Sequence, residues 1–165
     1  ADLKNLSLAK QYQVTDVMLP FVRNKADLII LREALREYGC EDIRIFAKIE
    51  NMTGVEHLEE LIPYCDYIVI ARGDLGNAMP LSQLPRIQAH IARVCRKHNK
   101  DFMIVTQMLD SMIKNPYPTR AEVNDIYHAV TQGASALMLT GETAHGKYPV
   151  EAMKMLMDTA EESIL

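Results

Sequence analysis

Short apolar runs alternate with longer amphipathic segments along the whole chain, and this alternation restricts the fold more than any other feature. The runs are apolar throughout, as in strands covered on both faces, and they predict strands at 14–19, 43–49, 67–71, 102–106 and 136–140. The longer segments predict helices at 25–38, 83–98 and 150–164. About five βα units in succession predict an α/β fold with a parallel sheet and right-handed crossovers.

The helices carry local signals of their own. Gly39 follows the predicted helix 25–38, at the place where a glycine commonly ends a helix in the left-handed conformation. Thr119 and Glu122 have the spacing of a capping box. In helix 150–164 the pattern predicts one apolar stripe, formed by Val150, Met153, Leu156, Met157 and Ala160.

The length of the chain limits the architecture. Its 165 residues, 48% of them hydrophobic and 24% charged, predict a single domain spanning residues 1–165. A closed βα barrel needs roughly eight units and about 250 residues. The pattern therefore predicts either an open doubly wound sheet or the later part of a barrel. In both folds function lies where strands end and helices begin.

Charge and cysteine content exclude several classes of function. A net charge of -4 gives no reason to expect nucleic acid or an anionic membrane as a partner. No apolar run approaches the length of a membrane span, and the first residues show no secretory signal. Cys40, Cys65 and Cys95 are scattered and lack metal-ligand spacing, so we expect them to be buried apolar residues in a reducing cytoplasm.

Polar residues follow four consecutive predicted strands. The strands at 43–49 and 67–71 run into "AKIENMTG" and "ARGDLG", and the next two run into "VTQMLDSM" and "MLTGETAHG". A purely structural sheet does not require polar residues at these places. Since loops at strand ends commonly carry function, we expect these segments to share one site.

Two carboxylates and a lysine stand at neighbouring strand ends. Lys48 and Glu50 are two residues apart, so a strand projects both to the same side, and Asp74 follows the next strand. Such a set suits Mg²⁺, which keeps several waters and uses one or two protein carboxylates with substrate oxygens. The alternative is a buried Lys48–Glu50 ion pair without a metal.

The segment after strand 67–71 has further candidates. Gly73 and Gly76 allow a ligand to approach the backbone closely. Arg72 either holds the loop or faces the ligand. Thr106 and Thr140 offer neutral hydroxyls at the same edge of the sheet, although each alone is more typical of an ordinary strand residue.

Four long stretches together resemble the pyruvate kinase family: "KIENMTGVEHLEEL", "IVIARGDLG", "VTQMLDSMIKNPYPTRAEV" and "GASALMLTGETAHGKYPVEA". They come in the order and spacing of that family, and "DVMLPFVRNKADL" resembles its preceding strand more weakly. The resemblance runs from Thr15 to the C-terminus. It implies a partial TIM barrel, strands four to eight of the catalytic barrel, without the first three strands, the lid domain or the C-terminal allosteric domain.

The resemblance also implies an activity, the transfer of a phosphoryl group between phosphoenolpyruvate and ADP to give pyruvate and ATP, as in the last step of glycolysis. Glu50 and Asp74 would bind Mg²⁺ or Mn²⁺, and Lys48 would be the catalytic lysine. Thr106 would lie beside the enolate carbon, and Thr140 takes the place of a serine on the protonation path. The substrate carboxylate would bind the backbone of Ala71, Arg72, Gly73 and Asp74. K⁺ would bind outside this chain, and ADP or ATP only with the rest of the barrel present.

The chain departs from the family pattern at Asn77 and Ala78, where an apolar residue and a glutamate are usual, and at Asn124, which replaces a serine or threonine. Two other functions stay open. One is a metal-dependent aldolase or lyase acting on a pyruvate enolate without nucleotide. The other is a non-catalytic module that self-associates. Because an open parallel sheet has unpaired edges, we expect a homo-oligomer under every interpretation.

Overall fold

The computed structural model describes residues 2–164, in which five parallel strands form one sheet in the order β1-β2-β3-β4-β5. The α/β fold and the predicted strands are confirmed, with ends that shift by up to two residues. The strands are β1 (Asp16–Leu19), β2 (Arg44–Ile49), β3 (Tyr67–Ala71), β4 (Asp101–Val105) and β5 (Ala136–Met138).

Helices connect successive strands, and those predicted from amphipathic segments are confirmed. They are α1 (Asp2–Leu6), α2 (Lys25–Glu37), α3 (Met52–Glu56), α4 (Leu58–Leu61), α5 (Arg72–Asn77), α6 (Leu84–Lys97), α7 (Arg120–Thr131), α8 (Gly141–Ala144) and α9 (Pro149–Glu162), with 3-10 turns at Ile62–Tyr64, Leu81–Gln83 and Asp110–Ile113. Gly39 has a φ of 64° just after α2, as its position predicts. Thr119 and Glu122 form the predicted capping box at the start of α7.

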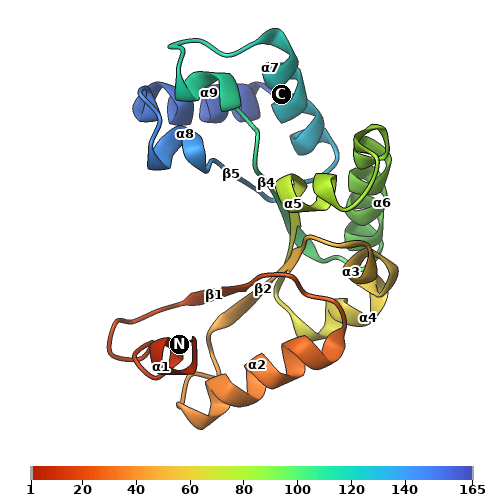
Figure 1. Ribbon diagram of the computed structural model, residues 1–165, viewed down its shortest axis with the longest axis vertical. Coiled ribbons are helices and arrows are strands. Elements are labelled where there is room, and N and C mark those ends of the chain that lie inside the picture. Colours follow the sequence, from red (N-terminus) through yellow and green to blue (C-terminus); the bar gives the residue numbers. More distant parts are fainter. Residues whose placement is uncertain (1, 165) are drawn as a thin grey trace.

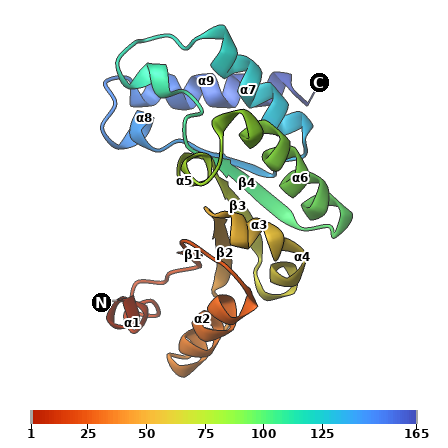
Figure 2. The same ribbon diagram turned by 45° about the vertical axis from the view of Figure 1, so that its right-hand side comes forward.

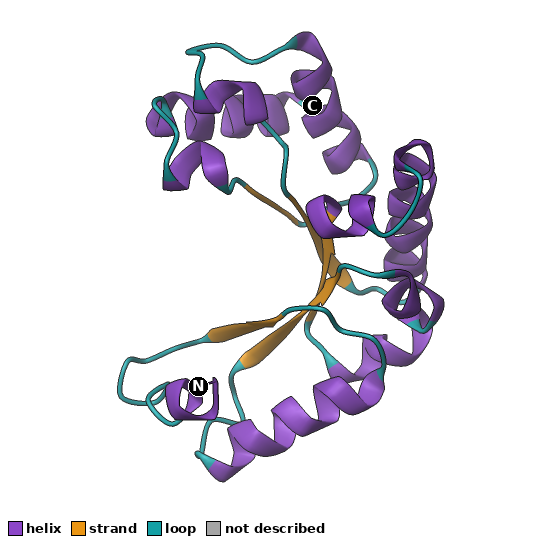
Figure 3. Ribbon diagram, in the orientation of Figure 1, coloured by secondary structure: helices purple, strands orange, loops and turns teal. Residues whose placement is uncertain are grey.

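The sheet is bent into an arc, and α2, α6, α7 and α9 lie on its outer side (Figure 1). Figure 2 shows α3, α4 and α6 along the same side of the central strands, and Figure 3 shows the strands as the inner layer. A doubly wound sheet has helices on both faces and reverses its strand order. The sequential order and one-sided helices therefore rule out that alternative and leave a partial barrel.

The two faces of the sheet differ in how they are covered. Ile45, Ala47 and Ile49 of β2 are fully buried against the helices, with matching residues of the other strands. Burial of one such isoleucine stabilises the fold by about 1.5–3 kcal/mol. On the inner, concave face a smaller cluster contains the buried residues Phe46, Val69, Ala71 and Val105.

Helix α9 packs on the core with a side that only partly matches the predicted stripe. Its buried residues are Ala152 and Leu156, whereas Val150, Met153 and Met157 are exposed. The prediction was right for Leu156 and for Ala160, which is partly buried against the core, and wrong for the other three residues. Met155 packs on the core beside Ala152 and Leu156, so the buried side is rotated relative to the predicted stripe.

The three cysteines are free and buried, as expected of small apolar residues. Burial raises the pKa of the Cys65 thiol to about 11 and that of Cys95 to about 12. A thiol with so high a pKa is scarcely ionised at neutral pH and reacts slowly. Within residues 2–164, no helix has both the length and the apolar character needed to cross a membrane.

Candidate active site

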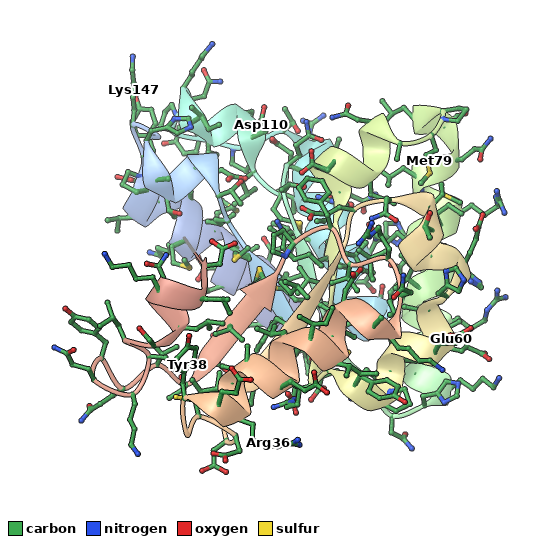
Figure 4. The ribbon with its side chains drawn as sticks, turned by 60° about the horizontal axis from the view of Figure 1, so that its bottom comes forward. Arg36, Tyr38, Glu60, Met79, Asp110 and Lys147 are labelled. Atoms are coloured by element: carbon green, nitrogen blue, oxygen red, sulfur yellow. The ribbon has the colours of Figure 1, made fainter. Side chains whose placement is uncertain are left out.

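Because the strands are parallel, the loops that follow them gather at one end of the sheet, which we call the carboxyl edge. Figure 4 shows this edge in its upper part, where Met79, Asp110 and Lys147 lie in segments that follow β3, β4 and β5. Arg36 and Glu60, which precede β2 and β3, lie in the lower part. The four polar segments therefore follow strands at the same edge, as predicted.

Lys48 and Glu50 form an ion pair at the carboxyl end of β2. The Lys48 Nζ lies 2.7 Å from Glu50 Oε1, and the Glu50 side chain is only 1% exposed. The backbone N–H of Phe21, in the loop after β1, donates to Glu50 Oε2 at 2.7 Å. Lys48 is two residues beyond Phe46 and so projects to the concave face. The ion pair itself is thus present, and the carboxylate still has lone pairs for a further partner.

Asp74 lies in the first turn of α5, which begins directly at the end of β3. Its side chain is exposed, and within residues 2–164 it takes part in no hydrogen bond or ion pair. No direct bond joins it to Glu50 in that part of the chain. The convergence of the two carboxylates on one ion therefore stays a prediction. Asn77 and Ala78, where the chain departs from the family pattern, are exposed at the end of the same helix.

The donor set fits a magnesium or manganese ion shared with a substrate. Among residues 2–164, no three His, Cys, Asp or Glu side chains form a group that can hold a metal by itself. Two carboxylates from neighbouring strand ends, one of them solvated, are the number and kind of protein ligands that Mg²⁺ uses beside substrate oxygens. The residues thus suit an ion that binds with a ligand.

Gly73 and Thr106 join the ends of β3 and β4. The Gly73 N–H donates to Thr106 Oγ1 at 2.8 Å, and Thr106 and Gln107 have positive φ angles of 76° and 53°. Left-handed backbone at a β-branched residue costs on the order of 1–3 kcal/mol and concentrates at functional sites. A Cβ built on Gly73 would lie 3.5 Å from Thr106 Oγ1, an ordinary contact. The fold does not itself demand glycine there.

Arg72 holds the loop that follows β4. Its Nε and Nη2 donate to the Thr106 carbonyl oxygen at 3.1 and 2.8 Å, and Nη2 also donates to Gln107 O at 3.1 Å. Its Nη1 lies 2.6 Å from Asp125 Oδ2 of α7. These bonds show the first of the two predicted roles, and substrate binding by Arg72 stays a prediction.

Thr140 is tied to Glu142 at the start of α8. The Thr140 N–H donates to Glu142 Oε2 at 2.8 Å, and Leu109 N–H, after β4, donates to Oε1 at 3.0 Å. Glu142 is 1% exposed. Burial acts to raise the pKa of its carboxyl, but the hydrogen bonds from Leu109, its own amide and Thr140 outweigh it, and the pKa is lowered. The ends of β4 and β5 are thereby joined.

The sequence analysis did not identify three residues that form hydrogen bonds or ion pairs at this edge. Phe21 acts through its backbone amide, which carries no signal in the sequence. Asp125 lies 53 positions from its partner Arg72. Glu142 stands within "MLTGETAHG", and its position as the only carboxylate of that strand-end segment is the one signal that could have marked it.

These features define a segment of a βα barrel whose carboxyl edge carries the polar groups. The family described as "Pyruvate kinase, barrel domain" matches residues 1–153. The chain is 43% identical over 162 residues to pyruvate kinase of Thermotoga maritima and 41% identical over 162 residues to that of Clostridium acetobutylicum, in each case over 98% of this chain. The chain belongs to the pyruvate kinase barrel-domain family.

The match covers much less of the relatives than of this chain. It spans 34% of the Thermotoga maritima and Clostridium acetobutylicum enzymes, and 36% of the pyruvate kinase of Methanocaldococcus jannaschii, which is 41% identical over 160 residues. The chain therefore spans about a third of the length of the curated relatives it matches.

Proposed function

We propose that this chain supplies the carboxyl-edge half of a pyruvate kinase site, which transfers a phosphoryl group between phosphoenolpyruvate and ADP. The observation that carries the proposal is the Lys48–Glu50 pair of 2.7 Å on the concave face, within a chain of this family. Phosphoryl transfer requires positioning and charge neutralisation more than covalent chemistry, and this edge offers both.

Lys48 would hold its ammonium group against the charge that develops on the phosphoryl group and on the enolate oxygen. Glu50 orients this amine and is itself held by the Phe21 N–H at 2.7 Å. The ammonium group would therefore already be positioned before a substrate binds. Glu50 and Asp74 would hold Mg²⁺ or Mn²⁺. When bound, the ion would neutralise charge on substrate oxygens.

The segment after β3 would bind the substrate carboxylate through the backbone of Ala71, Arg72, Gly73 and Asp74. A Cβ at Gly73 would be in ordinary contact with the Thr106 side chain at 3.5 Å, so this segment lies beside Thr106. Thr106 would lie beside the enolate carbon, where its hydroxyl is held by the Gly73 N–H at 2.8 Å. Thr140 would serve the protonation path.

Other parts of the proposal lie outside this chain. K⁺ and most of the nucleotide site would need the barrel strands that the relatives have in addition, and so would turnover of ADP or ATP. Where those additional strands are absent, the unpaired edges of β1 and β5 within residues 2–164 support self-association. The buried, unpaired cysteines support a cytoplasmic location.

The test is a lactate-dehydrogenase-coupled assay with phosphoenolpyruvate, ADP, Mg²⁺ and K⁺ on the complete polypeptide that carries this sequence. We expect turnover, and we expect Lys48→Met to lower kcat by roughly 10²–10³-fold. Because Lys48→Met leaves Glu50 buried without its cation, Lys48→Arg is the matched variant. It keeps a charge beside Glu50, so it should fold normally and still lose most of its activity.

Absence of turnover in the complete polypeptide would refute the proposal. Release of pyruvate from a 4-hydroxy-2-oxo acid without nucleotide would instead assign the same residues to an aldolase or lyase.

A further inference from the structure

Thr106 is held at both ends by two consecutive residues of the neighbouring segment. Its carbonyl oxygen accepts hydrogen bonds from the Arg72 guanidinium, and its hydroxyl accepts one from the Gly73 N–H. The hydroxyl also donates to the Val105 carbonyl oxygen, so the direction of its proton is set. Rotation of the left-handed backbone at Thr106 to an extended conformation would break the contacts to residues 72 and 73.

Arg72 is in turn fixed by helix α7. Its guanidinium is buried, and Asp125 Oδ2 accepts from Nη1 at 2.6 Å. Gln107 O and Met108 Sδ take further donor contacts from Nη2 at 3.1 and 3.0 Å. The planar fork of arginine reaches these partners together, which a lysine cannot do.

From this geometry we propose that Arg72 and Asp125 are positioning residues, which keep the Thr106 hydroxyl in the orientation required at the reacting carbon. Neither side chain needs to touch the substrate. The pair acts by stabilising the left-handed backbone at Thr106 and Gln107. Because Asp125 lies on α7, the order of this backbone then depends on the position of α7. This inference rests on the proposed function for the role of Thr106, but the backbone effect can be measured without it.

The amino edge of the sheet, where the segments that precede the strands lie, offers a matched control. Arg32 donates to the carbonyl oxygen of Ile43 at 2.9 Å and to Asp66 Oδ2 at 3.2 Å, so it too joins backbone and a carboxylate. It lies on α2, at the end of the sheet away from Thr106. Arg32→Lys should therefore cost stability of a similar kind without changing Thr106.

The experiment compares Arg72→Lys, Asp125→Asn and Arg32→Lys in the complete polypeptide that carries this sequence. The first readout is the NMR signal of the Thr106 methyl group after selective ¹³C labelling of threonine, assigned with Thr106→Ser. The second is the split between kcat and the KM for ADP. The third is the exchange of the methyl hydrogens of pyruvate with deuterium from solvent.

We expect Arg72→Lys and Asp125→Asn to shift the Thr106 signal and to lower kcat and methyl exchange about 10–100-fold, because displacement of an aligned group by about 1 Å costs that much. The KM for ADP should stay within about twofold, since no nucleotide contact is removed. Arg32→Lys should leave the Thr106 signal and kcat unchanged while lowering the melting temperature.

An unchanged Thr106 signal in both variants would overturn the proposal, and so would a shifted signal with unchanged kcat and methyl exchange. If Arg72→Lys does not fold, Asp125→Asn and Asp125→Ser carry the test, because both leave the buried arginine in place. If the unaltered polypeptide fails to use phosphoenolpyruvate, the proposed function fails, and a Thr106 signal that responds to Asp125→Asn still supports the positioning of the backbone.

Discussion

The two edges of the sheet solve the same structural problem with an arginine, but under different conditions. At the amino edge, Arg32 joins Asp66 to the backbone before β2, and the two side chains are 31% and 41% exposed. At the carboxyl edge, Arg72 joins Asp125 to the backbone after β4, and the arginine side chain is 9% exposed. Arg32 is partly exposed and binds backbone with ordinary φ angles, whereas Arg72 is buried and binds left-handed backbone.

The same contrast extends to the other polar groups. In residues 2–164 the buried charged residues are Glu50, Arg72 and Glu142. Glu50 and Arg72 directly follow β2 and β3, and Glu142 lies in the first turn of α8, the helix that follows β5. Burying a charge is costly unless it is fully paired, so a fold gains little by concentrating charges at one edge. The difference agrees with the chemistry proposed for the carboxyl edge and with a structural role for the amino edge.

The largest expected effect concerns the carboxylates at the end of β2 and β3. Glu50→Gln or Asp74→Asn should weaken Mn²⁺ binding by on the order of 100-fold or more, because loss of a mere outer-shell partner already costs 10–100-fold. Calorimetry or water-proton relaxation of the complete polypeptide measures it. Asp110→Asn is the control, since this exposed carboxylate lies at the same edge but outside the predicted pair. Unchanged Mn²⁺ binding in both variants would show that Glu50 and Asp74 do not hold a metal ion, and the carboxyl edge would then differ from the amino edge only in the burial of its charges.

Glycines at this edge should separate into those required by the fold and those required by a ligand. Gly54→Ala places a Cβ 2.5 Å from the Val22 carbonyl oxygen, so it should destabilise the protein by about 1–3 kcal/mol. Gly73→Ala makes only an ordinary contact at 3.5 Å and should leave stability unchanged. If the substrate carboxylate binds this backbone, the added methyl group should hinder its approach. The KM of the Gly73→Ala variant for phosphoenolpyruvate should then rise roughly 10–100-fold, the equivalent of one hydrogen bond to a charged group.

Urea denaturation and steady-state kinetics on the same preparations decide between these outcomes. A stable Gly73→Ala variant with an unaltered KM would show that this loop does not approach the substrate.

A third effect is smaller and depends on pH. Glu142 has a lowered pKa in the folded protein, so its stabilising contribution is complete above its ordinary pKa of 4.5 and is lost as the pH falls through the lower folded value. Glu142→Gln should cost about 1.5–3 kcal/mol at neutral pH, because an amide cannot accept from both Leu109 and Thr140 as a carboxylate does. The difference should shrink in acid. A difference in unfolding free energy that does not depend on pH would contradict this account.

Local rules predicted much of this molecule from the sequence. The strand at 67–71, the end of α2 at Gly39 and the capping box at Thr119 depend on residues within a few positions of each other. The Lys48–Glu50 pair follows from the period of a strand in the same way.

What the sequence did not predict depends on contacts between distant segments. Asp125 pairs with Arg72, and the Phe21 N–H donates to Glu50, because the folded sheet brings these distant segments together. The periodicity of α9 does not decide which of its apolar residues meet the core. The convergence of Glu50 and Asp74 stays a prediction for a related reason, since it depends on a ligand that both must hold.

The smallest expected effect is at the amino edge, where Asp16 and Arg44 pair between β1 and β2. The hydrogen bond from Arg44 lowers the pKa of the Asp16 carboxyl, so this pair too should stabilise the fold above the ordinary pKa of 3.8 and lose its effect below it. Both side chains are at least a third exposed, at 34% and 53%. Water and salt therefore screen the pair, whereas they do not reach Glu142.

Asp16→Asn should accordingly lower the unfolding free energy several-fold less than Glu142→Gln, and addition of about 0.5 M NaCl should remove most of the difference. Glu142→Gln should keep its full effect in salt, because its partners are buried backbone amides. Denaturation of both variants at low and high salt measures this. An Asp16→Asn effect as large and as resistant to salt as that of Glu142→Gln would mean that the amino edge also depends on protected charges, and the contrast between the two edges would fail.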